Sequence, residues 1–113
     1  MSEDCIFCKI IDKQIPSTIV YEDEDILAFK DINPVAPVHI LIIPKKHIPT
    51  ITDISEADLN LIGKIHLIAG KLAADTGIFD QGFRIVNNCR SDGGQVVYHL
   101  HFHLLGGKNM GGL

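Results

Sequence analysis

Three histidines alternate with apolar residues near the end of the chain, in the segment Tyr98-His99-Leu100-His101-Phe102-His103-Leu104-Leu105. Half of the six histidines of the protein lie there. Successive side chains of a β-strand point to opposite faces, so a strand from Val96 to Leu105 places the histidines on one face. A merely solvated face would carry Thr, Lys or Glu, because adjacent imidazoles repel one another when they protonate. The pattern predicts a strand with a core on one face and chemistry on the other.

Size and charge limit the organisation and the partners of the chain. A protein of 113 residues, 46% hydrophobic and 21% charged, is expected to form one domain over residues 1–113. Its net charge of −4 argues against broad electrostatic binding to nucleic acid or to an anionic membrane. The N-terminal residues lack the pattern of a secretion signal, and no apolar run is long enough to cross a membrane. We therefore expect a cytoplasmic protein.

Hydrophobic periodicity predicts an α+β order of elements. A short helix is expected around Cys5–Ile11, and a long helix from Ser55 until Gly77, where apolar residues recur at helical spacing. Segments rich in β-branched residues and bounded by turn residues predict strands at 18–21, 26–30, 38–43, 82–87 and 96–105. The expected fold is one antiparallel five-stranded sheet covered by helix. His66 is predicted to be an ordinary residue of the long helix rather than a ligand.

The chain has three cysteines, an odd number, and it lacks the pattern of a secretion signal. Both features disfavour a disulfide framework. Cys5 and Cys8 have the spacing of half a zinc site, but a redox pair or two incidental thiols would have the same spacing. Cys89 follows a predicted strand and has no assigned role.

A single metal ion held by all three alternating histidines is disfavoured by distance. Alternate residues of a strand lie about 6.6 Å apart, so His99 and His103 are separated by roughly 13 Å. Zinc ligands must converge on an ion that lies about 2.0–2.1 Å from each nitrogen. Two neighbouring histidines could still share an ion, so a metal-dependent hydrolase stays open as an alternative.

A division of labour among the histidines is the favoured interpretation. Neutral imidazole attacks phosphorus or acyl centres near pH 7, and the central His101 is placed to act as such a nucleophile. Its neighbours would orient it and bind the charge of the substrate. The turn Ser91-Asp92-Gly93-Gly94-Gln95 offers backbone N–H groups to a phosphate, although a Gly-Gly pair is more often simply a turn.

The histidine segment resembles the H-φ-H-φ-H-φ-φ signature of the histidine-triad superfamily of nucleotide hydrolases and transferases, where φ is apolar. Tyr98 and Leu105-Gly106-Gly107 resemble its histidine-triad nucleotide-binding (Hint) branch more than the branch of dinucleoside polyphosphate hydrolases. The resemblance spans nearly the whole chain and is carried by these further segments: Ile6–Ile11, Ala28–Pro34, Ala36–His39, Ile43–His47 and Ser91–Gln95.

The resemblance implies a purine nucleoside phosphoramidase whose middle histidine, here His101, attacks the α-phosphorus and forms a nucleotidyl-histidine intermediate. His103 would contact the phosphate, His39 would support the triad, and His99 completes the catalytic histidines. Asp31 would accept the ribose hydroxyls. The remaining implied substrate-binding residues are Asn88, Gly94, Gln95 and Val96 at the phosphate, and Phe7, Ile10, Ile32 and Leu41 at the purine.

Each of these roles has a purely structural alternative. Asp31 would otherwise be a turn residue before Pro34, and Asn88 would be a cap at a strand end. Phe7, Ile10 and Leu41 would be core residues. His39, inside an apolar strand, would be a buried histidine without a role in catalysis.

Members of the superfamily with an N-terminal Cys-x-x-Cys bind zinc through both thiols, a histidine after Pro-Lys-Lys, and the first histidine of the triad. The implied set here is Cys5, Cys8, His47 and His99. Two sulfurs and two nitrogens make a closed tetrahedral structural site that leaves no position for water. The alternative is a pair of reduced thiols that hold no metal.

Two positions depart from the Hint pattern. Val96 stands where these enzymes commonly carry Ser, so an altered rate or leaving-group preference is expected. The chain also ends at Leu113 without the longer Trp-containing tail of some members, which leaves the specificity for the leaving group open.

The resemblance also implies a two-fold homodimer, with the helix from Ser55 and the strand before it contributing to the interface. Two alternatives to a phosphoramidase stay open: a dinucleoside polyphosphate hydrolase of the same superfamily, and a nucleotide-binding scaffold with little turnover.

Overall fold

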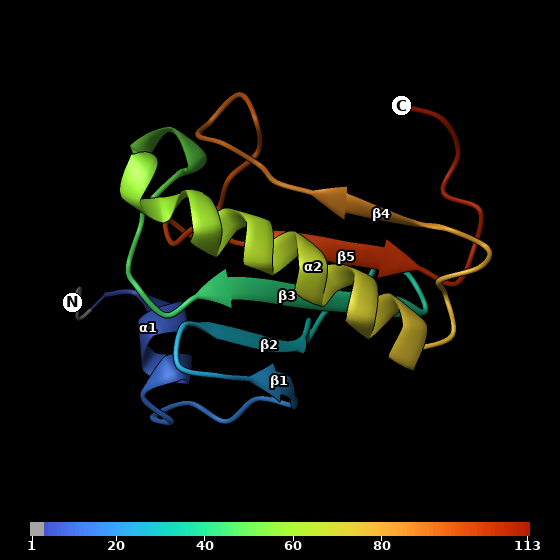
Figure 1. Ribbon diagram of the computed structural model, residues 1–113, viewed down its shortest axis with the longest axis horizontal. Helices are drawn as coiled ribbons and strands as arrows, with labels where there is room; N and C mark the ends of the chain where they lie inside the picture. The colour runs from blue at the N-terminus through green and yellow to red at the C-terminus, as the bar shows by residue number, and fades with distance from the viewer. Residues whose placement is uncertain (1–3) are drawn as a thin grey trace.

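The computed structural model describes residues 4–113, in which five strands form one antiparallel sheet (Figure 1). The order of the strands across the sheet is β1-β2-β3-β5-β4. Their bounds are Ile19–Glu22 for β1, Ile26–Lys30 for β2, Val38–Pro44 for β3, Phe83–Val86 for β4 and Phe102–Gly106 for β5. The predicted α+β fold, with one long and one short helix, is confirmed.

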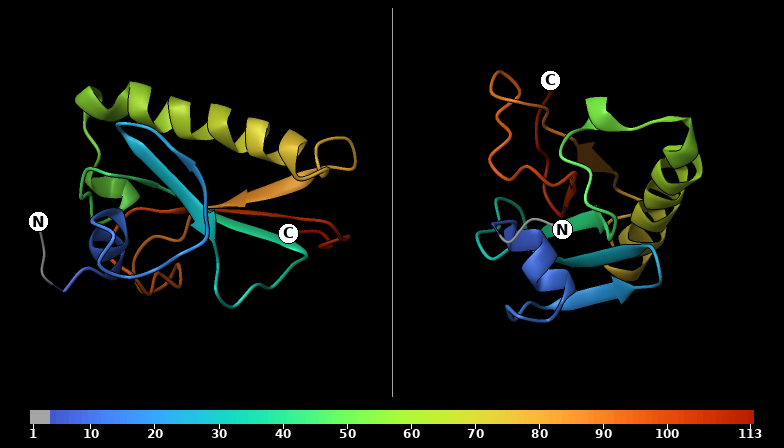
Figure 2. Two further views of the ribbon diagram at one scale, coloured as in Figure 1. Left: turned by 90° about the horizontal axis from the view of Figure 1, so that it is seen from below. Right: turned by 90° about the vertical axis from the view of Figure 1, so that its left-hand side faces the viewer.

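The long helix α2 (Leu59–Asp75) covers one face of the sheet (Figure 2). A 3₁₀ turn, Glu56–Asp58, precedes it, and Ser55 forms a capping box with Asp58 that satisfies free backbone N–H groups at this end. At the other end, Gly77 has a φ of 79°, a left-handed conformation that glycine adopts without strain. The buried face of α2 packs on Ile26, Ile40, Ile42, Leu100, Phe102 and Leu104 in the larger of two hydrophobic cores.

The short helix α1 (Ile6–Ile11) and the segment that leads into β5 lie on the opposite face of the sheet (Figure 2). Cys5 caps this helix, since its sulfur accepts a hydrogen bond from the Cys8 N–H. The smaller core lies under α1 and includes Phe7, Ile10, Phe29 and Leu41. This face, which is less completely covered than the α2 face, carries the histidines.

The predicted strand from Val96 to Leu105 is wrong in its first half, because β5 begins only at Phe102. The segment before it bonds to other groups: the Asn87 side chain donates to the His101 carbonyl at 2.9 Å, and the Leu100 N–H donates to the Ile48 carbonyl at 2.6 Å. The alternation of faces is nevertheless confirmed. Leu100 is in the core beneath α2, while the rings of His99 and His101 contact Phe7 of α1.

The expectation that the strand before the long helix contributes to a dimer interface stays a prediction. That strand, β3, is the central strand, with hydrogen bonds to β2 on one side and to β5 on the other. Six of its seven residues are buried. The free edges of the sheet are β1 and β4. Within residues 4–113 no helix is both long enough and apolar enough to cross a membrane.

Candidate active site

A cavity of about 1150 Å³ opens on the α1 face of the sheet. It lies between α1, the loop after β2, and the segment that joins β4 to β5. Nearly all of the predicted substrate-binding and catalytic residues line it: Phe7, Ile10, Asp31, Ile32, His39, Leu41, Asn88, Gly94, Val96, His101 and His103. Gln95 and His99 do not line it. We call it the reaction cavity.

The hydrogen bonds of His101 determine which of its nitrogens is free. Its Nδ1 lies 2.7 Å from the backbone carbonyl oxygen of His99. A carbonyl only accepts, so this Nδ1 carries the hydrogen and the neutral ring keeps a lone pair on Nε2. Phe7 packs edge-on against the ring, with centroids 5.1 Å apart. The His99 carbonyl and Phe7 of α1 therefore hold the ring of His101 in place, and its Nε2 is available as a nucleophile.

A second chain of hydrogen bonds fixes the tautomers of His39 and His103. The Val35 backbone N–H donates to Nδ1 of His39 at 3.2 Å, so Nε2 of His39 carries the hydrogen. That Nε2 lies 2.9 Å from Nδ1 of His103 and 3.3 Å from a carboxylate oxygen of Asp31. His103 therefore accepts at Nδ1 and carries its own hydrogen on Nε2. The N–H donor at Nε2 of His103 therefore lies on the ring next to His101, whose Nε2 carries a lone pair.

Asp31, His39 and His103 also bring three possible ligand atoms within 4.8 Å of one another, which raises the question of a metal ion. A metal on Nε2 of His39 would require the hydrogen to move to Nδ1. The hydrogen on Nδ1 of His39 would then point at the hydrogen of the Val35 N–H, and the hydrogen bond between these two groups would be lost. The hydrogen bonds of Asp31, His39 and His103 therefore favour a hydrogen-bonded chain over a metal site.

Burial keeps the site histidines neutral at pH 7. Burial, together with the neighbouring His101 and His39, lowers the pKa of His103 to about 4. Burial also lowers the pKa of His101, although its bond to the His99 carbonyl and the charge of Asp31 oppose the shift. The pKa of His39 is lowered by burial against the opposing charge of Asp31. Neutral rings keep the lone pairs that the tautomers described above require.

The apolar part of the reaction cavity is a slot between α1 and the sheet. Phe7 and Ile10 come from α1 and Leu41 comes from β3, and all three are almost fully buried. Ile32 is 90% exposed at the rim of the cavity, so it can close the slot only over a bound ligand. Asp31 stands at the same end, where one carboxylate oxygen accepts the Asn33 N–H at 2.8 Å.

The turn between β4 and β5 carries the predicted phosphate-binding residues, and most of its own polar groups are already bonded. The Gln95 side chain accepts from the Arg90 N–H and donates to the carbonyls of Pro49 and Val97, so it holds the turn in place. The N–H groups of Gly94 and Gln95 close the turn on Ser91 and Arg90. No acceptor among residues 4–113 bonds the Val96 N–H, which leaves it for a ligand.

Gly93 gives a direct test of this turn. A Cβ at this position would collide with the Cys89 carbonyl oxygen and lie 2.7 Å from the Cys89 nitrogen, which are backbone atoms. We expect Gly93→Ala to displace the turn and to lower kcat/KM for a nucleotide substrate about tenfold or more. The matched control is Gly70→Ala in α2, where a Cβ meets nothing within 4 Å and activity should not change. Unchanged activity in Gly93→Ala would show that the turn does not bind the substrate.

Four side chains converge beside the reaction cavity: Cys5, Cys8, His47 and His99. Nδ1 of His99 lies 3.3 Å from the sulfur of Cys5, 3.5 Å from that of Cys8 and 3.1 Å from Nδ1 of His47. The sulfur of Cys8 lies 3.2 Å from Nδ1 of His47. Ligands of a tetrahedral zinc ion lie about 3.3–3.8 Å apart. Two of these separations fall in that range, the two to His47 are slightly shorter, and all four ligand atoms lie within 4.8 Å of one another, so they are close enough to share one ion.

The surroundings of the cluster suit a metal as well. Nε2 of His99 bonds to the Pro44 carbonyl at 2.7 Å, which leaves the lone pair of Nδ1 facing the cluster. Burial lowers the pKa of His99 to about 4, so the ring stays neutral. Burial and the adjacent Cys5 raise the pKa of the Cys8 thiol, and a bound divalent cation would deprotonate it outright. The predicted ligand set is thus brought together in a form that could hold a metal ion.

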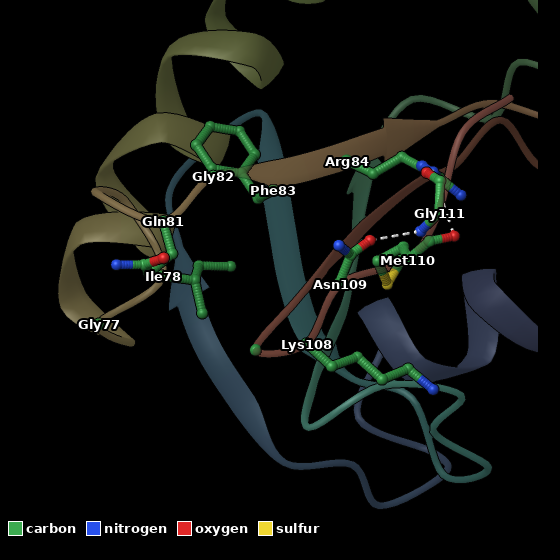
Figure 3. Close-up of a pocket in the computed structure, with 11 residues that line it drawn as sticks. Gly77, Ile78, Gln81, Gly82, Phe83, Arg84, Lys108, Asn109, Met110 and Gly111 are labelled. Atoms are coloured by element: carbon green, nitrogen blue, oxygen red, sulfur yellow. Dashed lines mark hydrogen bonds between the residues drawn. The ribbon is translucent and has the colours of Figure 1, made fainter.

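A further cavity, of about 700 Å³, lies far from these histidines, between the end of α2, β4 and the C-terminal residues (Figure 3). The guanidinium of Arg84 donates to the carbonyls of Met110 and Gly111, so β4 holds the end of the chain (Figure 3). Two charged residues, Arg84 and Lys108, line this cavity. Within residues 4–113, its lining contains no histidine, no cysteine and no carboxylate. It therefore offers no imidazole, thiol or carboxylate and is not the candidate active site.

Comparison with known proteins identifies the family, since the HIT domain matches residues 12–110. The chain belongs to the HIT family. The purine nucleoside phosphoramidase of Escherichia coli is 49% identical over 111 residues, which cover 98% of this HIT chain and 93% of the relative. Among solved structures, a HIT family hydrolase from Legionella pneumophila is 54% identical, with a TM-score of 0.94 and 96% of each chain covered. A HIT family hydrolase from Clostridium thermocellum is 52% identical, with a TM-score of 0.97, and covers 100% of this chain and 98% of its own.

Proposed function

We propose that this HIT protein is a purine nucleoside phosphoramidase. The observation that carries the proposal is the free Nε2 lone pair of His101, held in a cavity beside a hydrogen-bond donor on His103. The similarity to the Escherichia coli phosphoramidase over nearly the whole chain supports it. A neutral imidazole is a good nucleophile toward phosphorus and also a good leaving group in the following step.

The reaction begins when Nε2 of His101 attacks the α-phosphorus and forms a P–N bond to the ring. The original P–N bond of the substrate breaks, and the departing nitrogen takes up a proton. The neutral His103 donates the hydrogen on its Nε2 to a phosphate oxygen, and the departing nitrogen takes its proton from solvent. Water then attacks the nucleotidyl-histidine, which releases a nucleoside monophosphate and restores His101.

The remaining cavity residues hold the nucleotide. The Val96 N–H and the Asn88 amide would bind phosphate oxygens, while Gly94 and Gln95 shape the turn that carries them. The carboxylate of Asp31 would accept the ribose hydroxyls, a task that its two oxygens suit. The purine would lie in the slot of Phe7, Ile10 and Leu41, with Ile32 closing over it. His99 acts through its backbone carbonyl, which orients His101.

The proposal is tested with adenosine 5′-phosphoramidate, from which the purified protein should release AMP and ammonia. A dinucleoside polyphosphate serves as the competing substrate, and we expect a much lower kcat/KM for it. Faster turnover of the dinucleotide would favour the alternative hydrolase. AMP binding without turnover of any phosphoramidate or dinucleotide would favour the scaffold.

The pH profile should show that the catalytic imidazoles are buried. Their pKa values lie below the ordinary value of 6.5, so the neutral, reactive form persists to lower pH. We expect kcat/KM to stay level from pH 8 to about 6.5 and to fall only below that pH, after subtraction of the acid hydrolysis of the substrate. A midpoint at or above pH 6.5 would contradict the burial of the nucleophile in the free enzyme.

Asp31→Asn tests the proposed ribose contact through the preference for the ribonucleotide over the 2′-deoxy substrate, because the Asp31 charge also acts on His39 and would affect both substrates alike. The amide oxygen keeps the hydrogen bond from the Asn33 N–H. The second carboxylate oxygen and the negative charge, which would help to accept the two ribose hydroxyls, are lost. We expect a KM about tenfold higher for the ribonucleotide and a reduced preference over the 2′-deoxy substrate, measured by steady-state kinetics. Asp80→Asn, at an exposed carboxylate outside the cavity, is the control. Retention of the full ribose preference in Asp31→Asn would exclude this role.

We further propose that Cys5, Cys8, His47 and His99 hold a zinc ion. Four protein ligands would complete a tetrahedral site, so the metal would act as a structural cross-link between α1, the end of β3 and the histidine segment. It would not take part in the reaction.

We also propose a two-fold homodimer. The support is the free edge of β4, with Phe83 partly exposed, together with the exposed apolar residue Leu67 of α2. Light scattering of the purified protein measures this directly, and a monomeric mass would contradict it. The cytoplasmic location expected from the sequence stays a prediction.

A further inference from the structure

Three large apolar side chains lie exposed at one end of the reaction cavity. Val96 is 87% exposed, Tyr98 is 47% exposed and Ile6 of α1 is 46% exposed. Single exposed apolar residues are ordinary on a protein surface, but a group of them around a hollow indicates a binding surface. These three come from two separate parts of the chain and line one hollow.

That hollow is a second, smaller cavity of about 400 Å³, which we call the side cavity. It shares Ile6, Val96 and Val97 with the reaction cavity, so these three residues stand between the two. Tyr98 and Pro49 form part of its far wall. Asp4 and two residues of the Cys5, Cys8, His47 and His99 cluster complete the lining.

The position of the side cavity limits what can reach it. If the ribose lies at Asp31 and the phosphorus at His101, the nucleoside already fills the Asp31 side of the reaction cavity. The remaining substituent of the phosphorus is the leaving amine. A substituent that extends past Val96 enters the side cavity, since the two cavities meet there.

We infer that the side cavity is a subsite for the organic group of the leaving amine and that it selects an aliphatic or aromatic group. This inference rests on the proposed function. The side chain of Val96 offers no hydrogen bond, and the ring of Tyr98 offers an apolar face that gains from being covered. When the P–N bond breaks, the nitrogen leaves with the bonding pair, takes up a proton and departs as a free amine. Tyr98 is the specificity-determining residue, because it lines the side cavity and does not line the reaction cavity.

The test uses four adenosine 5′-phosphoramidates with the full-length protein. One is unsubstituted, and the others carry N-propyl, N-(2-hydroxyethyl) or N-(2-phenylethyl) groups, none of which chelates a metal strongly. Propyl and hydroxyethyl have the same number of heavy atoms and differ in polarity. We expect kcat/KM to be about tenfold higher for the phenylethyl than for the hydroxyethyl substrate, with propyl between them. Tyr98→Ala should reduce this preference to about threefold or less and leave turnover of the unsubstituted substrate within about twofold.

The comparison of the two proteins cancels intrinsic differences among the amines, because each substrate serves as its own reference. Phe79→Ala, at an exposed aromatic residue that lines neither cavity, is the matched control and should keep the wild-type preference. Equal kcat/KM for propyl and hydroxyethyl in the wild type, or a full preference in Tyr98→Ala, would overturn the subsite. Absence of turnover of the unsubstituted substrate by the wild type would instead contradict the proposed function.

Discussion

Replacement of His101 by alanine is expected to lower the turnover of adenosine 5′-phosphoramidate by roughly 10⁴-fold or more. The substitution removes the nitrogen that attacks phosphorus, and the two-step route through a covalent intermediate is lost with it. Binding of AMP should persist, because the slot of Phe7, Ile10 and Leu41 and the carboxylate of Asp31 are retained. Steady-state kinetics and calorimetric titration with AMP measure the two quantities on the same preparation.

His66→Ala is the matched control for this substitution. His66 is exposed on α2, its Nδ1 bonds to the Ile62 carbonyl at 2.9 Å, and it lies on the other face of the sheet. We expect its kcat to equal that of the wild type. Substantial activity in His101→Ala would assign the nucleophile to another group.

Removal of the metal cluster should have the largest effect on stability. In Cys8→Ala, three ligands would remain around a buried site, and we expect a loss of about 3 kcal/mol and a fall in Tm of at least about 10 °C. Metal analysis of the purified protein should find one zinc per chain in the wild type and much less in the variant. Cys89→Ala, at a free cysteine outside the cluster, should change neither quantity.

A chelator distinguishes a structural ion from a catalytic one. If the zinc is structural, activity should fall only in step with unfolding, followed by circular dichroism on the same sample. Rapid loss of activity in a folded protein would show that the metal takes part in the reaction. A zinc-free wild type with unchanged Tm would contradict the cluster itself.

The sequence predicts the fold, and it predicts most of the residues that line the reaction cavity, because both depend on patterns that span few residues. The alternation of His101, Phe102 and His103 placed the rings and the core on opposite faces, as the structure shows. The spacing of residues along a strand also predicts that His99 and His103 lie too far apart to share one ion. In the structure His99 lies in the cluster with the two cysteines, while His103 lies with His39 and Asp31.

The features that the sequence missed depend on backbone groups brought close by folding. The carbonyl of His99 and the N–H of Val35 set the tautomers of His101 and His39, and any residue at these positions would supply the same groups. The start of β5 at Phe102 was missed for a similar reason. The chain before it bends at residues 97–99, and groups such as the Asn87 side chain replace a neighbouring strand as its partners. The role of Gln95 as the support of the turn likewise depends on Pro49, 46 residues away.

The proposed mechanism requires a covalent bond between the nucleotide and His101. Protein quenched in acid-free conditions during turnover of adenosine 5′-phosphoramidate should carry one nucleotidyl group in its intact mass spectrum. Fragmentation should place that group on His101, and the adduct should be absent in His101→Ala. An adduct on His103, or rapid turnover with no adduct under any quench, would contradict the account.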